Sequence, residues 1–320
     1  MSYKKTEKAT GDFTQLNEKS IKFINYSQKL YSHIKNTFQV RPSSFDIVNL
    51  KIKSPEGKIP IRIYYPKDTV KYKENPCMMF IHGGGFVMGN LDTHENICMK
   101  LAKESQRVVI SVDYRLAPKN IYPLAIRDCY CAYYYIAKNH KALKIDMDNI
   151  VLCGTSAGGN LALAVMEMCL RRRKRGALPK AIALMYPVTD IESILMEDYP
   201  KSVLENMNEP KLSLENMNAM LKYYIPYFDK SAGTEYSQFL GNPYISPVKS
   251  ELIFHYPKTI IVSAGKDILR DENSIFANTL AQNAVEFEHH EFKNMNHAFM
   301  SFDSKDTDKA IELISDFIDF

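Results

Sequence analysis

Short runs of apolar residues alternate with longer stretches of helical periodicity over most of the chain. A run that is apolar throughout is typical of a strand buried on both faces of a parallel sheet. Apolar residues that recur every three or four positions indicate the helices that cover such a sheet. We therefore predict an α/β fold with a mostly parallel, doubly wound sheet of about eight strands. The parallel strands are expected at residues 77–81, 108–112, 149–153, 181–187, 259–264 and 286–292, and two of the helices at 95–105 and 124–138.

Two further strands precede these runs and differ from them in pattern. Apolar and polar residues alternate over residues 46–53, and isoleucines share one face of the segment 59–65. Alternation is typical of strands that have one solvated face. The turn sequence at residues 55–57 lies between the two segments. This part of the chain predicts an antiparallel hairpin at one edge of the sheet.

Two segments interrupt the alternation of strand and helix. Apolar positions in residues 1–40 indicate one or two amphipathic helices, and residues 190–245 show no clear strand. The second segment lies between two strands, so it must leave the sheet and return to it. We expect both segments to form a helical cap over the C-terminal ends of the strands, where ligands bind in open α/β sheets. The N-terminal positions are Ile21, Phe23, Ile24, Leu30, Tyr31 and Ile34.

The predicted organisation therefore has four parts. Residues 1–45 form the N-terminal cap helices, and residues 46–189 form the first part of the α/β core. Residues 190–245 form the cap insertion, and residues 246–320 complete the core.

The composition narrows the class of protein. A formal net charge of +4 over 320 residues is too small to indicate a nucleic-acid partner. The basic run at residues 171–175 could be interpreted as a nuclear-import or nucleic-acid-binding segment. We favour a position at the C-terminus of a helix, because the helix dipole stabilises cations there. No apolar run reaches the ~18 residues of a membrane span. The polar, basic segment 1–11 does not resemble a secretory signal, so we expect a cytoplasmic location.

Six cysteines are present, and none of them forms a C-x-x-C pair. This spacing gives little support to a zinc site or a thioredoxin-type redox site. Most of the cysteines lie inside apolar runs, as buried free thiols do. We therefore expect neither a metal nor an organic cofactor.

The candidate chemistry centres on a strand, a tight turn and a helix near the middle of the chain. The turn Gly154-Thr155-Ser156-Ala157-Gly158 follows an apolar run and precedes an apolar helical series. This is the context of a G-x-S-x-G nucleophile elbow, which exposes a serine hydroxyl at the N-terminus of a helix. An ordinary glycine-rich turn is the alternative, since the five-residue pattern also arises by chance.

A serine nucleophile needs a base and a group that orients the base. Asp267 lies just past one predicted strand, and His297 lies in a loop after the next. The order Ser, Asp, His is that of α/β-hydrolases. Other candidates remain open: the histidines His82, His289 and His290, and the acids Asp271 and Glu272, which are better explained as first-turn residues of the next helix.

The segment His82-Gly83-Gly84-Gly85 offers hydrogen-bond donors for an oxyanion. Glycines let backbone N–H groups approach a substrate carbonyl without interference from Cβ, and lipases and esterases place an HGGG segment after an early strand. A phosphate-binding loop is the alternative. The segment lacks the Lys-Ser/Thr ending of a P-loop and the spacing of G-x-G-x-x-G.

Together these motifs resemble the hormone-sensitive-lipase family of α/β-hydrolase esterases, the bacterial-type HGGG carboxylesterases. The resemblance spans about residue 60 to the C-terminus, and it implies an α/β-hydrolase fold with a helical cap. It also implies roles for six residues: Ser156 as nucleophile, Asp267 as orienting acid, His297 as base, and the backbone N–H groups of Gly83, Gly84 and Ala157 as oxyanion donors. The matching segments, in family order, are His82–Phe86, Asp113–Pro118, Gly154–Asn160, Asn242–Pro247, Gly265–Glu272 and His297–Phe299.

The chain departs from the family pattern at two positions. Thr155 stands before the serine where the family usually has aspartate, and Lys119 follows Leu-Ala-Pro where it usually has glutamate. The elbow requires only small neighbours, so the serine keeps its role. We expect the lysine to reverse a charge near the site.

The expected function is that of a serine carboxylesterase acting on short- to medium-chain esters through an acyl-enzyme, and the expected pocket is capped, apolar and lined by tyrosine and methionine side chains of the insertion. Its partner would be a small-molecule ester, and family members often pair, so a homodimer is compatible with the resemblance. Two alternatives are a non-catalytic ligand-binding receptor on the same fold, and an amidase or deacetylase. The presence of His297 disfavours the receptor, because the plant gibberellin receptors that resemble this family lack the catalytic histidine.

Overall fold

The computed structural model describes residues 17–38, 43–67, 74–172, 178–225 and 239–319. Within them, an eight-stranded sheet has the order β1-β2-β4-β3-β5-β6-β7-β8. β2 pairs antiparallel with β1 and with β4, and all other neighbours pair in parallel. The strands are β1 (Phe45–Ser54), β2 (Gly57–Pro66), β3 (Asn75–Ile81), β4 (Val108–Val112), β5 (Ile145–Thr155), β6 (Ala181–Met185), β7 (Lys258–Lys266) and β8 (Phe287–Asn296).

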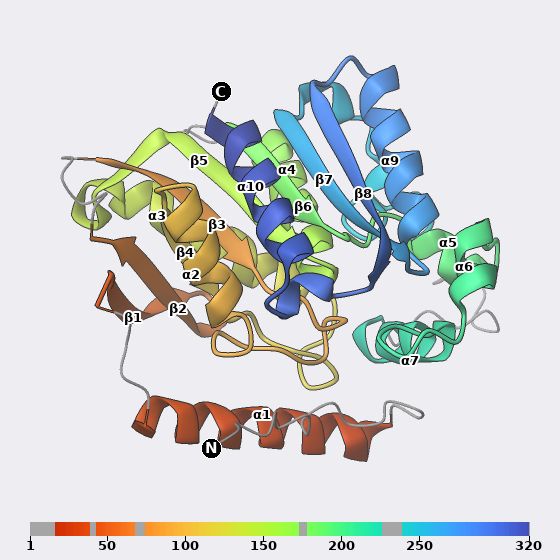
Figure 1. The fold of residues 1–320 in the computed structure, drawn as a ribbon, viewed down its shortest axis with the longest axis horizontal. Coiled ribbons are helices and arrows are strands. Elements are labelled where there is room, and N and C mark those ends of the chain that lie inside the picture. The colour runs from red at the N-terminus through yellow and green to blue at the C-terminus, as the bar shows by residue number, and fades with distance from the viewer. Residues whose placement is uncertain (1–16, 39–42, 68–73, 173–177, 226–238, 320) are drawn as a thin grey trace.

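Helices cover both faces of this sheet (Figure 1). α2 and α10 pack on one face, and α3, α4 and α9 pack on the other. This arrangement confirms the predicted doubly wound α/β fold. The bounds are α2 (Glu95–Glu104), α3 (Leu124–Leu143), α4 (Ala157–Arg172), α9 (Arg270–Gln282) and α10 (Lys305–Asp319).

The continuous apolar runs do lie in strands that are buried on both faces. In β5, Leu152 belongs to the apolar core under α3 and α4, while Val151 and Cys153 belong to the core under α2 and α10. Successive side chains of a strand point to opposite faces, so a strand between two helical layers must be apolar at every position. The cysteines are free, and four of the six, including Cys153, are buried.

The N-terminal hairpin forms as predicted. β1 lies at one edge of the sheet and pairs with β2 in a register that sets Ile52 opposite Ile59. The isoleucines of β2 at positions 59, 61 and 63 are all buried. Their shared face therefore holds the hairpin on the core.

Helix α3 is longer than the sequence indicated, because it continues to Leu143 rather than ending near residue 138. The buried side chain of Leu143 extends the apolar face by a turn, and Lys144 ends the helix in a left-handed conformation with φ of 55°. β5 then begins at Ile145, a few residues before the expected strand. Residues 139–148 are mostly polar, so the hydrophobic pattern indicated neither the later end of the helix nor the earlier start of the strand.

Helical elements lie at the end of the sheet where the parallel strands terminate. In Figure 1, α1 (Glu18–Phe38) runs along the lower edge of the molecule. The helices α5 (Ile191–Met196), α6 (Lys201–Asn206) and α7 (Leu214–Tyr224) lie on the right, between β6 and β7 in the chain. Residues 1–16, 39–42 and 226–238 of the predicted cap segments lie outside the described residues.

The N-terminal segment forms a helix, α1, where the sequence predicted one or two amphipathic helices. Of its expected apolar face, Ile21 is buried, whereas Phe23 and Leu30 are exposed. The side chains of Tyr31 and Ile34 lie outside the described part of the structure. A periodic pattern gives the angular spacing of side chains but does not tell which side of the helix faces the protein. In the described part of the chain, no helix combines the length and the apolar character that crossing a membrane requires.

Candidate active site

Ser156 occupies the sharp turn between β5 and α4. Its backbone has φ of 51°, and its N–H donates to the carbonyl of Met185 at 2.9 Å. Glycines at both ends of the motif permit this turn. A Cβ on Gly154 would lie 2.2 Å from the carbonyl oxygen of Gly158, and a Cβ on Gly158 would lie 2.1 Å from that of Ile81. The local sequence therefore lifts one hydroxyl off the end of the strand, as a nucleophile elbow does.

The structure brings Asp267 and His297 to this hydroxyl. Asp267 directly follows β7 and His297 directly follows β8, so both lie at the carboxyl edge of the sheet beside the elbow. The Ser156 hydroxyl donates to Nε2 of His297 at 2.9 Å, and Nδ1–H of His297 donates to Oδ2 of Asp267 at 2.6 Å. The other carboxylate oxygen, Oδ1, accepts from the N–H of Leu269 at 3.0 Å. Because Nδ1–H is bonded to Asp267, the unprotonated Nε2 of His297 is placed to accept the proton of the Ser156 hydroxyl.

All three side chains of this candidate triad are buried, with exposed fractions of 8% for Ser156, 1% for Asp267 and 6% for His297. The ring of Tyr186, at the end of β6, packs edge-on against the imidazole with centroids 5.0 Å apart. Burial raises the pKa of the Tyr186 phenol, and the carboxylate of Asp267 raises it further. Burial lowers the local dielectric constant around these groups, which strengthens the electrostatic interactions between them.

The other candidate bases have different partners. Nδ1–H of His82 donates to the carbonyl of Gly83 at 2.8 Å, and its ring stacks on Tyr114. Burial lowers the pKa of His82 to about 4, so it stays neutral. His289 pairs with Ser263, and His290 pairs with Glu288. None of these contacts involves the Ser156 hydroxyl.

The candidate acids Asp271 and Glu272 lie in the first turn of α9, as the sequence indicated. Asp271 accepts from the N–H of Ser202 at 2.7 Å, and Glu272 accepts from the N–H of Thr189 at 2.6 Å. Both carboxylates therefore hold backbone segments beside the site.

The glycine-rich loop after β3 lies against the elbow. A Cβ on Gly83 would meet the carbonyl oxygen of Thr155 at 2.9 Å, and Gly84 adopts φ of 120°, which favours glycine. Within the described residues, no backbone carbonyl accepts from the N–H groups of Gly83, Gly84 or Ala157. Ala157 also opens helix α4, whose N-terminus carries partial positive charge. These three donors are free to serve a ligand.

A cavity of about 360 Å³ opens over Ser156 and His297. Its walls come from the glycine loop, from Gln28 of α1, and from an apolar face of α7. In the described part of the chain, no carboxylate lines this cavity. The α7 face and the bend before it contribute Leu212, Met217, Met220 and Leu221.

The two departures from the family pattern have separate consequences. Thr155 is buried between the elbow and the glycine loop, and its hydroxyl has no hydrogen-bond partner among the described residues. Lys119 does not line the cavity over Ser156. It lines a second cavity, of about 1140 Å³, between α1 and the segment after β4. The charge reversal at Lys119 therefore lies in a different cavity from the candidate triad, contrary to our expectation.

The sequence predicted methionine and tyrosine side chains of the insertion around an apolar pocket, and α7 does contribute Met217 and Met220 to the cavity. Their spacing is that of any helical core pair, so the sequence predicted the kind of side chain but not these two positions. Gln28 and Tyr186 were not predicted as cavity residues. Tyr186 lies near the C-terminal end of the predicted strand 181–187, and residues at that edge of a sheet commonly reach the ligand site.

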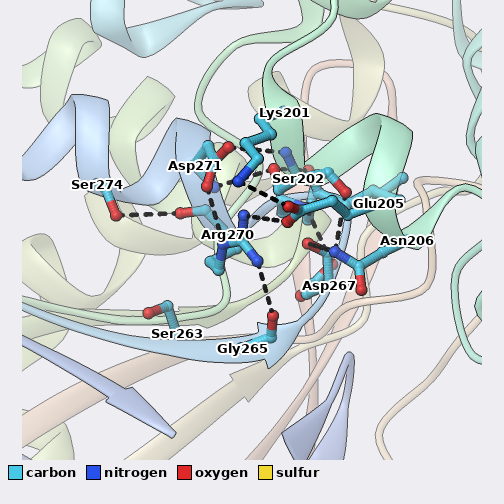
Figure 2. A network of polar contacts seen from close by, with 12 residues as sticks. Lys201, Ser202, Glu205, Asn206, Ser263, Gly265, Asp267, Arg270, Asp271 and Ser274 are labelled. Atoms are coloured by element: carbon cyan, nitrogen blue, oxygen red, sulfur yellow. Dashed lines mark hydrogen bonds and ion pairs between the residues drawn. The ribbon is translucent and has the colours of Figure 1, made fainter. Parts of the chain in front are cut away.

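A network of polar contacts joins helix α6 to the loop that carries Asp267 (Figure 2). The Ser202 hydroxyl donates to the carbonyl of Ile268 at 2.9 Å and accepts from the N–H of Asp271 at 3.1 Å. Asn206 donates to the carbonyl of Asp267 itself at 3.3 Å.

The guanidinium of Arg270 extends this network. It contacts Glu205 of α6 at 2.8 Å, Asp271 at 2.8 Å and the carbonyl of Gly265 at 3.3 Å. Hydrogen bonds to the carboxylates raise the pKa of Arg270. The insertion is thereby tied to the backbone on both sides of Asp267.

The insertion also contacts the loop that carries His297. Glu209, after α6, accepts a hydrogen bond from the amide of Asn296, and the ammonium of Lys211 lies 4.8 Å from the ring centroid of Phe302. One short segment of the insertion thus touches both loops that supply the candidate triad.

Comparison with known proteins shows which family and fold this chain resembles. A family described as the alpha/beta hydrolase fold matches residues 78–301. The chain is 33% identical over 259 residues to the esterase LipI of Mycobacterium tuberculosis, covering 80% of this chain and 75% of that protein. It is 32% identical to an arylesterase of Saccharolobus solfataricus, covering 74% of this chain and 71% of the relative.

Solved structures give the same result. A hyperthermophilic esterase from the archaeon Pyrobaculum calidifontis superimposes with a TM-score of 0.82 at 28% identity, covering 95% of this chain and 93% of that structure. The family match at residues 78–301 includes the elbow and both loops of the candidate triad. The chain therefore belongs to the hormone-sensitive-lipase-like carboxylesterase family of α/β-hydrolases.

Proposed function

We propose that this chain is a serine carboxylesterase that hydrolyses small-molecule esters through an acyl-enzyme, with Ser156, His297 and Asp267 as its triad. The observation that carries the proposal is the unbroken chain of hydrogen bonds from the Ser156 hydroxyl through His297 to Asp267 at the floor of an apolar cavity. That arrangement is what acyl transfer by a serine nucleophile requires. Relatives that are called esterases support the same reaction class.

In the first step, the Ser156 oxygen attacks the ester carbonyl while Nε2 of His297 accepts its proton. Asp267 keeps the imidazole in the tautomer whose Nε2 is free to accept, and it stabilises the imidazolium that forms. The alcohol then leaves with the proton that His297 returns. In the second step, His297 takes a proton from water, which hydrolyses the acyl-Ser156 ester and restores the enzyme.

The negative charge that develops on the carbonyl oxygen is assigned to the N–H groups of Gly83, Gly84 and Ala157. Donors held in place before the reaction need no reorganisation as charge develops, and removing one such donor typically costs ~10²–10³ in kcat. Support comes from the lack of competing backbone acceptors for these groups among the described residues.

Residues 1–45 and 190–245 are proposed to act as the cap of the cavity. In the described part of these segments, Gln28 and the α7 face line it. The thioether and aliphatic side chains of α7 suit an acyl chain, so the proposed substrates are esters of short- to medium-chain acids.

The decisive experiment replaces the proposed nucleophile. Ser156→Ala should lower kcat for p-nitrophenyl acetate and butyrate by at least ~10³-fold, because no other group can form the acyl-enzyme. The matched control is Ser105→Ala, at the end of α2, where the hydroxyl bonds only the carbonyl of Leu101. Circular dichroism should show both variants folded. Undiminished turnover by Ser156→Ala would remove the mechanism.

A further inference from the structure

Helix α1 turns a polar side toward the rest of the protein. The amide of Asn25 donates to the carbonyl of Val87 at 2.9 Å, and Gln28 accepts from the N–H of Gly89 at 3.2 Å. Gln28 also lines the cavity over Ser156. The described contacts named here are therefore of two kinds. Ile21 is buried, while Asn25 and Gln28 form hydrogen bonds with backbone groups of the core.

The opposite side of α1 carries three exposed apolar side chains, one of which, Tyr26, also lines the second cavity. Phe23 is 71% exposed, Tyr26 is 65% exposed and Leu30 is 47% exposed. Their spacing of three and then four residues places them on one face of a helix. We call these three residues the outer stripe. A surface helix normally buries its apolar face and exposes its polar one, so the outer stripe has the pattern of an interaction surface rather than of ordinary surface.

The charge of α1 indicates what the outer stripe contacts. The helix sequence contains four lysines and one glutamate. Lys19 and Lys22 are exposed close to the stripe, and Lys22 forms an ion pair with Glu18, which is also exposed. A basic helix with aromatic and aliphatic residues on one face is typical of segments that lie in the interface of an anionic membrane. A second copy of the same helix would instead bring like charges together.

We propose that α1 docks on an anionic lipid surface through Phe23, Tyr26 and Leu30. This inference deepens the proposed function and rests on it: the same helix forms a wall of the cavity over Ser156, so docking would place that cavity at the lipid surface. Esters dissolved in the lipid phase then become the substrate class that the enzyme meets first.

The test measures co-sedimentation of the full chain with vesicles, of phosphatidylcholine alone or of phosphatidylcholine mixed with phosphatidylglycerol. We expect binding to the mixed vesicles that weakens by about tenfold or more in the variant Phe23→Ser/Tyr26→Ser/Leu30→Ser, since the stripe supplies the buried apolar area. Raising the salt concentration should also weaken it, because screening removes the electrostatic contribution.

A matched control replaces three other exposed apolar residues, as Leu178→Ser/Phe254→Ser/Ile275→Ser, which are 47%, 56% and 45% exposed. This control should bind vesicles as the wild type does. Both triple variants should keep the wild-type rate on dissolved p-nitrophenyl acetate, while only the stripe variant loses activity on tributyrin carried in the mixed vesicles.

Three results would overturn the proposal: no sedimentation with mixed vesicles, equal sedimentation with neutral ones, or a solution dimer that the stripe variant dissociates without any vesicle binding. Failure of the proposed function has a different signature. A wild type that binds vesicles but does not hydrolyse p-nitrophenyl acetate would contradict the esterase mechanism and leave the docking result standing.

Discussion

At the scale of single residues, the site depends on backbone positions that side chains would disturb. Ser156 adopts a left-handed conformation that is costly for any residue with a Cβ. The surrounding hydrogen bonds maintain it, including the bond from its N–H to Met185. The neighbouring glycine loop depends in the same way on the absence of side chains, which makes its role open to a direct test.

Gly83→Ala should lower kcat by about 10²-fold with little change in KM, because its Cβ would press on Thr155 and the Cβ of Ser156 and so displace the oxyanion donors. Steady-state kinetics with p-nitrophenyl butyrate measures this. Ser105→Ala is the control, since its hydroxyl bonds the carbonyl of Leu101 at the end of α2 and the residue does not line the cavity. Equal kinetics for the two variants would argue against Gly83 as part of the oxyanion site.

Glu272 is a second residue whose environment matters, because burial changes the pKa of its carboxyl group. It is 1% exposed, and burial raises its pKa to about 8 from an ordinary value of 4.5, although the N–H of Thr189 opposes the shift. The folded state therefore binds this proton more tightly than the unfolded state does. By linkage, the stabilisation from the neutral carboxyl group is fully present below the unfolded pKa and is lost as the pH rises through about 8.

Glu272→Gln should remove this pH dependence, because an amide cannot ionise and can still accept from the backbone of Thr189. The difference in Tm between wild type and variant should shift in favour of the variant as the pH rises from about 5 to about 9. Thermal unfolding followed by circular dichroism at several pH values measures it. Parallel curves over that range would show that Glu272 does not titrate as described.

At the scale of elements, the insertion contacts the core where the chemistry is proposed to occur. α7 packs on the glycine loop, with Tyr224 stacked on Phe86 at a centroid distance of 4.0 Å. α6 bonds the acid loop through Ser202, which is fully buried. The cap segments therefore hold functional loops in addition to closing the cavity.

Ser202→Ala tests the link to the acid loop. It leaves the N–H of Asp271 and the carbonyl of Ile268 without the hydroxyl, so Asp267 should lose its fixed position. We expect kcat to fall about tenfold while KM stays near its wild-type value, since small displacements of catalytic groups act on the chemical step. Ser274→Ala removes a similar hydroxyl contact further along α9 and should have wild-type kinetics. A rise in KM alone would assign Ser202 to substrate binding instead.

At the scale of the whole molecule, the size of the cavity limits the substrate. Its volume of about 360 Å³ lies near the lower end of typical ligand pockets. Core and cap both contribute to its walls, so its dimensions depend on how α1 and α7 sit over the sheet.

The acyl-chain profile should therefore show a maximum at short or medium length. Among p-nitrophenyl acetate, butyrate, octanoate and laurate, kcat/KM should be lowest for laurate, because its chain exceeds the enclosed apolar space. Met220→Ala should shift the maximum toward longer chains, since its side chain lines the cavity against Gly85. A profile that rises steadily to laurate would contradict an enclosed cavity of this size.

The sequence by itself determined the parts of this protein that depend on near neighbours. The alternation of apolar runs and helices predicted the doubly wound sheet, because burial on two faces demands an apolar residue at every position of a strand. The elbow around Ser156 was equally readable, since glycine spacing and the steric limits of a turn act within five residues. The candidates Asp267 and His297 came from their positions after strands together with the family pattern.

Only the tertiary structure decided which distant groups meet. His297 and Ser156 are 141 residues apart, and only the packing that sets His82 against Tyr114 removes that histidine as a rival base. The orientation of α1 and the separate cavity of Lys119 also depend on contacts between remote segments. Such contacts depend on many weak interactions spread over the whole chain, so no local pattern of residues predicts them.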